Sequence, residues 1–153
     1  SDVQRALGPA ALDRVGKLVA ASELAHGGEI RVCVEAGLPL SYLWRDAPAR
    51  ERALALFGKL RVWDTEHNNG VLIYLLLAER AIEIVADRGL SRHVPQAHWQ
   101  QLAQGMSAEF KAGRFEEGLG SAIGAVHELL HQHFPLASGT ANPNELPDTP
   151  ALR

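Results

Sequence analysis

The sequence predicts an α/β protein: a three-layer α/β/α sandwich around a small mixed sheet of three to four strands, with about four helices. Three observations support this fold class. Residues 71–78 form an unbroken apolar run of strand length, which is typical of a central strand covered on both faces. Residues 29–36 alternate between apolar and polar side chains, as half-buried strands do. Apolar residues recur at helical spacing before, between and after these strands.

Composition limits the class of protein. A chain of 153 residues is most simply one domain, and it can bury roughly 68–70% of its unfolded surface. The net charge of -3 and the scattered Lys and Arg residues predict no nucleic-acid partner. The single cysteine, Cys33, excludes an intrachain disulfide. No apolar run reaches the ~18 residues of a membrane span and no signal peptide opens the chain, so we expect a cytoplasmic protein.

The first half of the chain predicts helix, strand, helix. We expect residues 1–9 to be a lead-in, followed by a helix over 9–26 that two glycines end. A strand follows over 29–36, then a loop over 37–45. The next helix, over 46–60, carries its apolar stripe at Ala49, Ala53, Leu56, Phe57 and Leu60.

A polar loop over 64–70 leads into the central strand at 70–78. The Glu79-Arg80 break is too short for anything but a hairpin into a half-polar strand over 80–87. Strand, helix and strand form a right-handed crossover, so the first two strands should be parallel. The third strand should pair antiparallel with the second.

Two more helices and a tail complete the expected domain, which spans residues 10–135. Helices are predicted over 94–113 and 115–133. Three glycines, Gly118, Gly120 and Gly124, suggest that the second of these helices lies very close to the sheet. Residues 136–153 are rich in proline and predict an extended tail that drapes over the surface.

Two tryptophans flank the helix over 46–60. We expect Trp44 and Trp63 to pack into the core, because large aromatic side chains dominate core burial. The alternative is an exposed surface that contacts a partner.

The order and spacing of several segments resemble one known family. They are Gly28-Glu29-Ile30-Arg31-Val32, the helix with Phe57, Asn69-Gly70-Val71-Leu72-Ile73, the strand from Ile82 to Gly89, and then Trp99, Phe110 and Gly118-Leu119. Over residues 10–135 the chain resembles the TPM domain, a family with thylakoid-lumen phosphatase-like members and many bacterial domains. The resemblance implies an α/β/α sandwich, binding of calcium or another divalent ion, and weak acid-phosphatase activity in some relatives. It also implies a membrane-protein complex or another protein as partner.

The predicted topology gathers side chains that can bind ions at one rim of the sheet, because the first two strands start there and the third ends there. The residues at this rim are His26, Glu29, Asp64, Glu66, His67, Asn68, Asn69, Asp87, Arg88 and His93. Carboxylate and amide oxygens suit Ca²⁺ or Mg²⁺. The expected metal ligands are Asp64, Asn68, Asn69, Asp87 and Glu29. The alternative is ordinary loop chemistry, since Asp, Asn and Gly favour turns.

The usual ligand position in open α/β sheets is the other rim, at the carboxyl ends of the parallel strands. That rim offers the smaller set Glu35, Glu79 and Arg80. Our leading hypothesis is nonetheless a binding or assembly module with a cation site at the first rim. The alternative is a weak metal-dependent phosphatase, in which Asp64 and Asp87 hold the metal and Arg88 steadies the phosphate.

A distant alternative is a zinc hydrolase. His127-Glu128-Leu129-Leu130-His131 matches the H-E-x-x-H pattern of zinc peptidases. However, His127 falls about 60° and His131 about 100° from the centre of the helix's apolar stripe. No third ligand follows at the expected spacing, so we do not expect Zn²⁺ as a cofactor. The helix dipole also explains histidines near a helix C-terminus.

Overall fold

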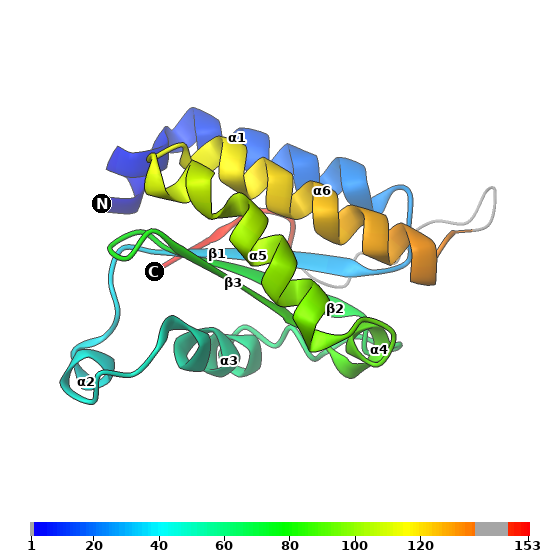
Figure 1. Cartoon of the computed structure of the whole chain (residues 1–153). Helices are drawn as coiled ribbons and strands as arrows, with labels where there is room; N and C mark the ends of the chain where they lie inside the picture. Colours follow the sequence, from blue (N-terminus) through cyan, green and yellow to red (C-terminus); the bar gives the residue numbers. More distant parts are fainter. Residues whose placement is uncertain (1, 137–146) are drawn as a thin grey trace.

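The computed structural model describes residues 2–136 and 147–153 (Figure 1). Within these ranges the chain forms six helices and four strands. Their bounds are α1 (Asp2–Glu23), β1 (Glu29–Glu35), α2 (Leu40–Trp44), α3 (Ala49–Lys59), β2 (Gly70–Leu76), β3 (Ala81–Ala86), α4 (Arg88–Ser91), α5 (Gln96–Lys111), α6 (Phe115–His133) and β4 (Ala151–Leu152).

The strands form one mixed sheet in the order β3-β2-β1-β4. β1 and β2 are parallel, with Glu29 beside Gly70 and Glu35 beside Leu76. β2 and β3 form an antiparallel hairpin. These pairings confirm the predicted crossover and hairpin. Since β3 ends the strand order, its outer edge carries no further strand in the part of the chain that the structure describes.

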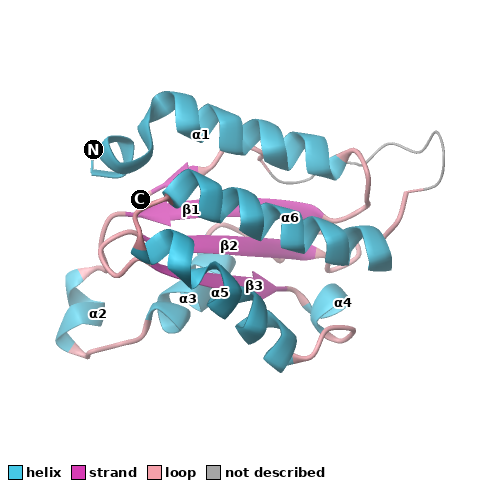
Figure 2. Cartoon of the chain, turned by 45° about the horizontal axis from the view of Figure 1, so that its top comes forward, coloured by secondary structure: helices cyan, strands magenta, loops and turns pink. Residues whose placement is uncertain are grey.

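Helices cover both faces of the sheet, which confirms the α/β/α class. α1, α5 and α6 lie on one face, and α3 lies on the other with α2 beyond its start (Figures 1 and 2). Two apolar clusters result, one on each face, and they meet across β2, in which every residue is buried. The apolar run of β2 is therefore explained, because no side of this strand faces water.

The glycines of α6 serve helix packing rather than close approach to the sheet. A Cβ at Gly118 would lie 2.5 Å from the ring of Phe110 in α5. A Cβ at Gly120 would lie 3.8 Å from Leu18 of α1, and at Gly124 it would meet nothing within 4 Å. The expectation that these residues touch the sheet was wrong. Gly118 instead lets the ring of Phe110 pack directly on the α6 backbone.

The two ends of the chain differ from the predicted lead-in and tail. Residues 2–9 are helical, because Val3 and Leu7 are buried in the core on the α1 side. Gly8, at φ 73°, makes the kink that the sequence suggested as a helix start. At the other end, Ala151–Leu152 adds to β1 as a short parallel strand. The rest of the predicted tail falls partly in 137–146, outside the described residues.

Both flanking tryptophans are substantially exposed, so the prediction of core packing was wrong. Trp44 is 81% exposed and Trp63 is 48% exposed. Each lies at or beyond the end of a helix, where helical periodicity no longer indicates which direction is inward. Among the described helices, none is both long enough and apolar enough to span a membrane.

Candidate functional site

Backbone hydrogen bonds bring the predicted rim segments together. The N–H of Asp87 donates to Gly70 O at 2.9 Å, and the N–H of Gly89 donates to Asn68 O at 2.8 Å. Only glycine fits at position 89, because a Cβ there would lie 2.3 Å from His67 O. The loop over 64–69 and the segment after β3 therefore share one rim, as predicted. We call these two segments, with residues 26–29, the oxygen-rich rim.

Several predicted ligands have structural partners at this rim. The Asn69 carboxamide donates to Gly27 O at 2.9 Å, and the Asp87 carboxylate caps α4 by accepting from Arg88 N at 2.7 Å. Asp64 is exposed and paired with Arg61 at 3.0 Å. Asn68 takes a left-handed conformation with φ 51°, which a turn requires. Turn chemistry thus accounts for much of the polar pattern.

Two oxygens at the oxygen-rich rim are not accounted for by such contacts. Asn69 Oδ1 and Asp87 Oδ2 are buried and accept no hydrogen bond among the described residues. A buried acceptor without a partner is costly, and a hard cation is one group that could satisfy it. Amide and carboxylate oxygens are ligands that Ca²⁺ and Mg²⁺ prefer. Among the described residues, however, no group of three His, Cys, Asp or Glu side chains surrounds these two oxygens, and cation binding stays a prediction.

Glu29 belongs to a separate carboxylate cluster. Its side chain engages buried Glu23 of α1, and Glu23 also hydrogen-bonds Asp148 and accepts from Ile30 N at 2.9 Å. Burial is the main reason that the pKa of Glu23 is raised to about 11, with the neighbouring carboxyls adding to it. The raised pKa favours retention of a proton among the carboxyls of this cluster at neutral pH.

His127 of the H-E-x-x-H segment takes part in a hydrogen-bond chain with Ser22 and buried His26. Gly28 N–H donates to His26 Nδ1 at 3.1 Å, so a neutral His26 carries its proton on Nε2. That nitrogen lies 2.9 Å from Ser22 Oγ, which in turn lies 2.8 Å from His127 Nδ1. The chain ties α1, the lead into β1 and α6 together. His131 stacks on His127, with 6.0 Å between ring centroids.

This arrangement gives the zinc hydrolase hypothesis no third ligand. In residues 2–136 and 147–153, no group of three His, Cys, Asp or Glu side chains is arranged to hold a metal ion. Glu128 is exposed, as the helical periodicity indicated.

At the opposite rim the structure adds partners that the sequence analysis missed. Glu35 is buried and accepts from Arg52 Nε at 3.0 Å, Arg52 Nη2 at 2.8 Å and Tyr74 OH at 2.6 Å. Burial acts to raise the pKa of Glu35, but the bonds from Arg52 and Tyr74 outweigh it and the pKa is lowered. Arg52 stands three residues after Ala49 on the apolar stripe of its helix, which indicates a buried charge but does not identify its partner. Glu79 and Arg80 are exposed.

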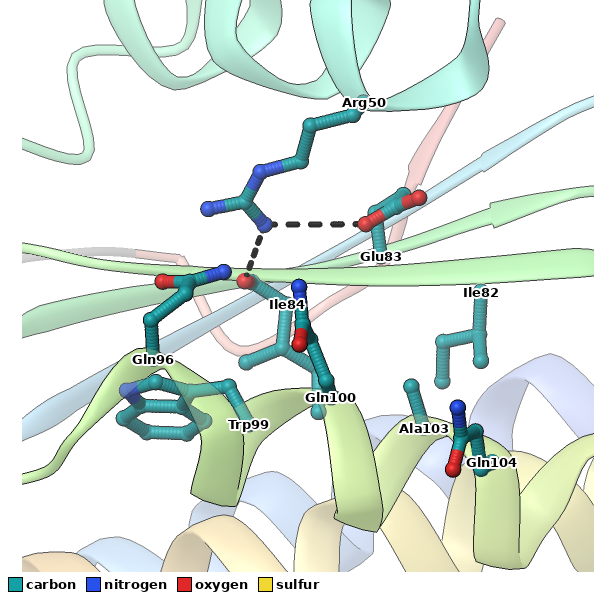
Figure 3. Close-up of a pocket in the computed structure, with 9 residues that line it drawn as sticks. All are labelled: Arg50, Ile82, Glu83, Ile84, Gln96, Trp99, Gln100, Ala103 and Gln104. Atoms are coloured by element: carbon teal, nitrogen blue, oxygen red, sulfur yellow. Dashed lines mark hydrogen bonds and ion pairs between the residues drawn. The ribbon is translucent and has the colours of Figure 1, made fainter.

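A groove of about 490 Å³ opens along the outer edge of β3, between α3 and α5 (Figure 3). This volume is in the usual range for ligand pockets. Its lining residues come from three elements: Arg50, Ile82, Glu83, Ile84, Gln96, Trp99, Gln100, Ala103 and Gln104.

The α3 side of the groove is charged. Arg50 Nη1 donates to the main-chain oxygen of Ile84 at 2.6 Å and lies 3.6 Å from Glu83 Oε2. Burial raises the pKa of the Glu83 carboxyl, and Arg50 opposes that rise. Arg50 thus occupies one acceptor on the open sheet edge.

The α5 side of the groove is amide-rich. Gln96, Gln100 and Gln104 follow one another along the helix, beside β3 (Figure 3). Trp99 is only 5% exposed, yet its indole Nε1 has no acceptor among the described residues. The four-residue repeat of glutamines was visible in the sequence. The sequence did not reveal that these glutamines lie beside a sheet edge, because that depends on how α5 packs against β3.

Comparisons with known proteins agree with this architecture. The model of the TPM domain family matches residues 1–129. The NMR structure of the BA42 protein from the psychrophilic bacterium Bizionia argentinensis is similar, with 26% identity and a TM-score of 0.78. That match covers 94% of this chain and 93% of the other. The N-terminal domain of a P. gingivalis protein shares the fold at 22% identity and a TM-score of 0.67, with 84% and 81% covered. Curated proteins give no match.

The family match spans most of the chain, and it begins at residue 1 rather than at the expected residue 10. The helical residues 2–9 of α1 are therefore part of the matched domain. The chain belongs to the TPM domain family.

Proposed function

We propose that this TPM domain is a polypeptide-binding module and that the groove between β3 and α5 is its binding site. The observation that carries the proposal is the open edge of β3 at the floor of a hollow of about 490 Å³. A protein segment is the occupant that we expect, because the groove offers both donors and acceptors for main-chain amides.

The residues of the groove favour binding over catalysis. Its titratable side chains are Arg50 and Glu83, and they are paired with each other. Among the described residues that line it, none is a Ser, Cys, His or Lys that could act as a nucleophile. The glutamine amides and the indole of Trp99 are neutral and would orient a ligand by hydrogen bonds.

The test is a selection of random dodecapeptides displayed on phage, using the wild-type chain as bait. Gln100→Trp would fill the middle of the groove, whereas Gln101→Trp changes an exposed neighbour on α5 outside it. We expect peptides whose affinity falls at least about tenfold, or ~1.4 kcal/mol, in Gln100→Trp and is unchanged in Gln101→Trp. Isothermal titration measures both. Peptides that bind the two variants equally would contradict the proposal.

A second candidate is a divalent-cation site at the oxygen-rich rim. It is supported by Asn69 Oδ1 and Asp87 Oδ2, which are buried and have no hydrogen-bond partner among the described residues. Here Asn69 and Asp87 would hold the ion, which could polarise a phosphate ester in the phosphatase alternative, with Asp64 and Arg88 nearby in sequence.

A thermal-shift panel across Ca²⁺, Mg²⁺, Mn²⁺ and Zn²⁺ tests this candidate. A cation at about 100 times its Kd adds roughly 2.7 kcal/mol, which raises the melting temperature by several degrees. Asp87→Asn should abolish the shift while keeping α4 capped, because asparagine is an equally good N-cap. A flat panel would exclude the site. Turnover of an aryl phosphate that disappears in Asp87→Asn would favour the phosphatase.

A further inference from the structure

We infer that the groove takes its polypeptide as a fifth strand, added to the outer edge of β3. This inference rests on the proposed function and specifies the conformation of the occupant. Asp87 N–H points inward to Gly70 O, and antiparallel pairing alternates inward and outward groups along a strand. The N–H and C=O groups of Ile82, Ile84 and Ala86 therefore face outward.

The structure gives direct evidence of this alternation. The oxygen of Ile84 accepts from Arg50 at 2.6 Å, which is possible only because that oxygen points away from β2. In the free chain the Arg50 guanidinium, which reaches over from α3, covers part of the edge of β3. Charged side chains at sheet edges often prevent unwanted strand pairing in this way. An incoming main-chain N–H would replace the guanidinium at Ile84. Arg50 would keep Glu83 as its partner.

The spacing of α5 matches that of an added strand. Residues four apart on a helix are separated by about 6 Å along its axis. Residues two apart on a strand are separated by about 6.6 Å. The carboxamides of Gln96, Gln100 and Gln104 can therefore meet successive equivalent positions of one extended chain. Figure 3 shows Gln100 beside Ile84 and Gln104 towards Ile82, so this row runs along the strand.

Trp99 supplies a second reason to expect a main-chain ligand. Its buried indole N–H has no acceptor among the described residues, and the side chain lines the groove. Leaving a buried donor unpaired costs about 1–3 kcal/mol. The nitrogen lies beside Gln96 and has no surface open to the groove in the free chain, so a carbonyl oxygen of an added strand would satisfy it once the neighbouring side chains move aside.

An extended segment fits these features better than other occupants. A helix satisfies its own main-chain groups and could not pair with Ile82 or Ile84. A second copy of this chain would have to bring a whole sheet edge between the walls formed by α3 and α5. A single strand from a partner protein needs only the width of one chain.

The experiment is an N-methyl scan of one dodecapeptide obtained from the selection above. Each variant methylates one main-chain nitrogen, which removes one N–H donor. We expect a period of two: methylation at alternate residues weakens binding at least about tenfold, and methylation between them changes it by less than about threefold.

The possible outcomes separate the two proposals. A groove-dependent peptide without the two-residue alternation would overturn the fifth strand and leave the binding module standing. If no peptide depends on the groove, both fall. A wild-type dimer that dissociates in Gln100→Trp and binds no peptide would identify a second copy as the occupant, and would overturn the inference.

Discussion

Replacing Arg52 with alanine is expected to lower the free energy of unfolding by about 3–5 kcal/mol. Arg52 holds the buried Glu35 carboxylate with two bonds, at 3.0 and 2.8 Å. Without it, Glu35 keeps one donor, Tyr74 OH at 2.6 Å, and stays charged in the core or takes up a proton. Either outcome costs stability, because a lone buried charge is poorly solvated and a carboxyl takes up a proton at neutral pH only at a cost in free energy.

Urea denaturation at neutral pH measures this effect, and two variants control it. Arg61→Ala removes an exposed pair with Asp64, so we expect a loss within about 1 kcal/mol. Adding Glu35→Gln to Arg52→Ala should recover part of the loss, because it removes the uncompensated charge and keeps an acceptor for Tyr74. A loss under about 1 kcal/mol in Arg52→Ala would contradict the pairing.

Acidification is expected to remove about 3 kcal/mol of stability through His26 alone. Burial, and to a smaller extent His127 and His131, lowers the pKa of His26 from 6.5 to about 4. At pH values between about 4 and 6.5, His26 is protonated in the unfolded chain and neutral in the folded chain. Stability from His26 is therefore complete above pH 6.5 and is lost as the pH falls towards 4.

Glu23 acts in the opposite direction and hides this effect in the wild-type curve. Because its folded pKa is raised to about 11, Glu23 contributes stability that is complete below pH 4.5 and declines as the pH rises. The effect of His26 must therefore be measured as a difference between variants over the same pH range.

The informative comparison is wild type against His26→Asn, whose side-chain oxygen can still accept from Gly28 N–H. The gap in unfolding free energy between them should narrow by about 3 kcal/mol from pH 7.5 to pH 4. His98→Asn, at an exposed position on α5, controls for the loss of an imidazole. A gap that stays constant with pH would mean that His26 is not held neutral by burial.

Local patterns predicted the sheet well. The apolar run of β2 reflects burial on both faces, and the crossover rule then fixed the direction of β1 and β2. The alternation of β1 predicted a half-buried strand, but every β1 residue except Arg31 is buried. Convergence of the loop over 64–69 with Asp87 followed from that topology. Strand ends were predicted less accurately. β2 ends at Leu76 rather than at 78, and β3 starts at Ala81 rather than at 80, since Arg80 takes a turn conformation with φ 48°.

Features that depend on contacts between distant elements could not be predicted in this way. β4 is only Ala151–Leu152, which is too short to give a pattern, and it is held by pairing with Cys33 and Val34. The two partners of Glu35 lie on α3 and β2, and Glu23, the partner of Glu29, lies on α1. The groove, likewise, exists only because α5 and α3 stand on either side of β3.

The central claim, that a polypeptide occupies the groove, is tested most directly by the indole N–H signals of the three tryptophans in a ¹⁵N NMR titration with a selected dodecapeptide. The account predicts that the Trp99 signal moves downfield as its unpaired N–H gains an acceptor. The chemical shifts of the other two indole signals should not change. Trp63 Nε1 already donates to Gly58 O at 3.2 Å, and Trp44 is exposed and lies outside the groove. A Trp99 signal that stays fixed while Trp44 shifts would place the peptide at α2 and contradict the account.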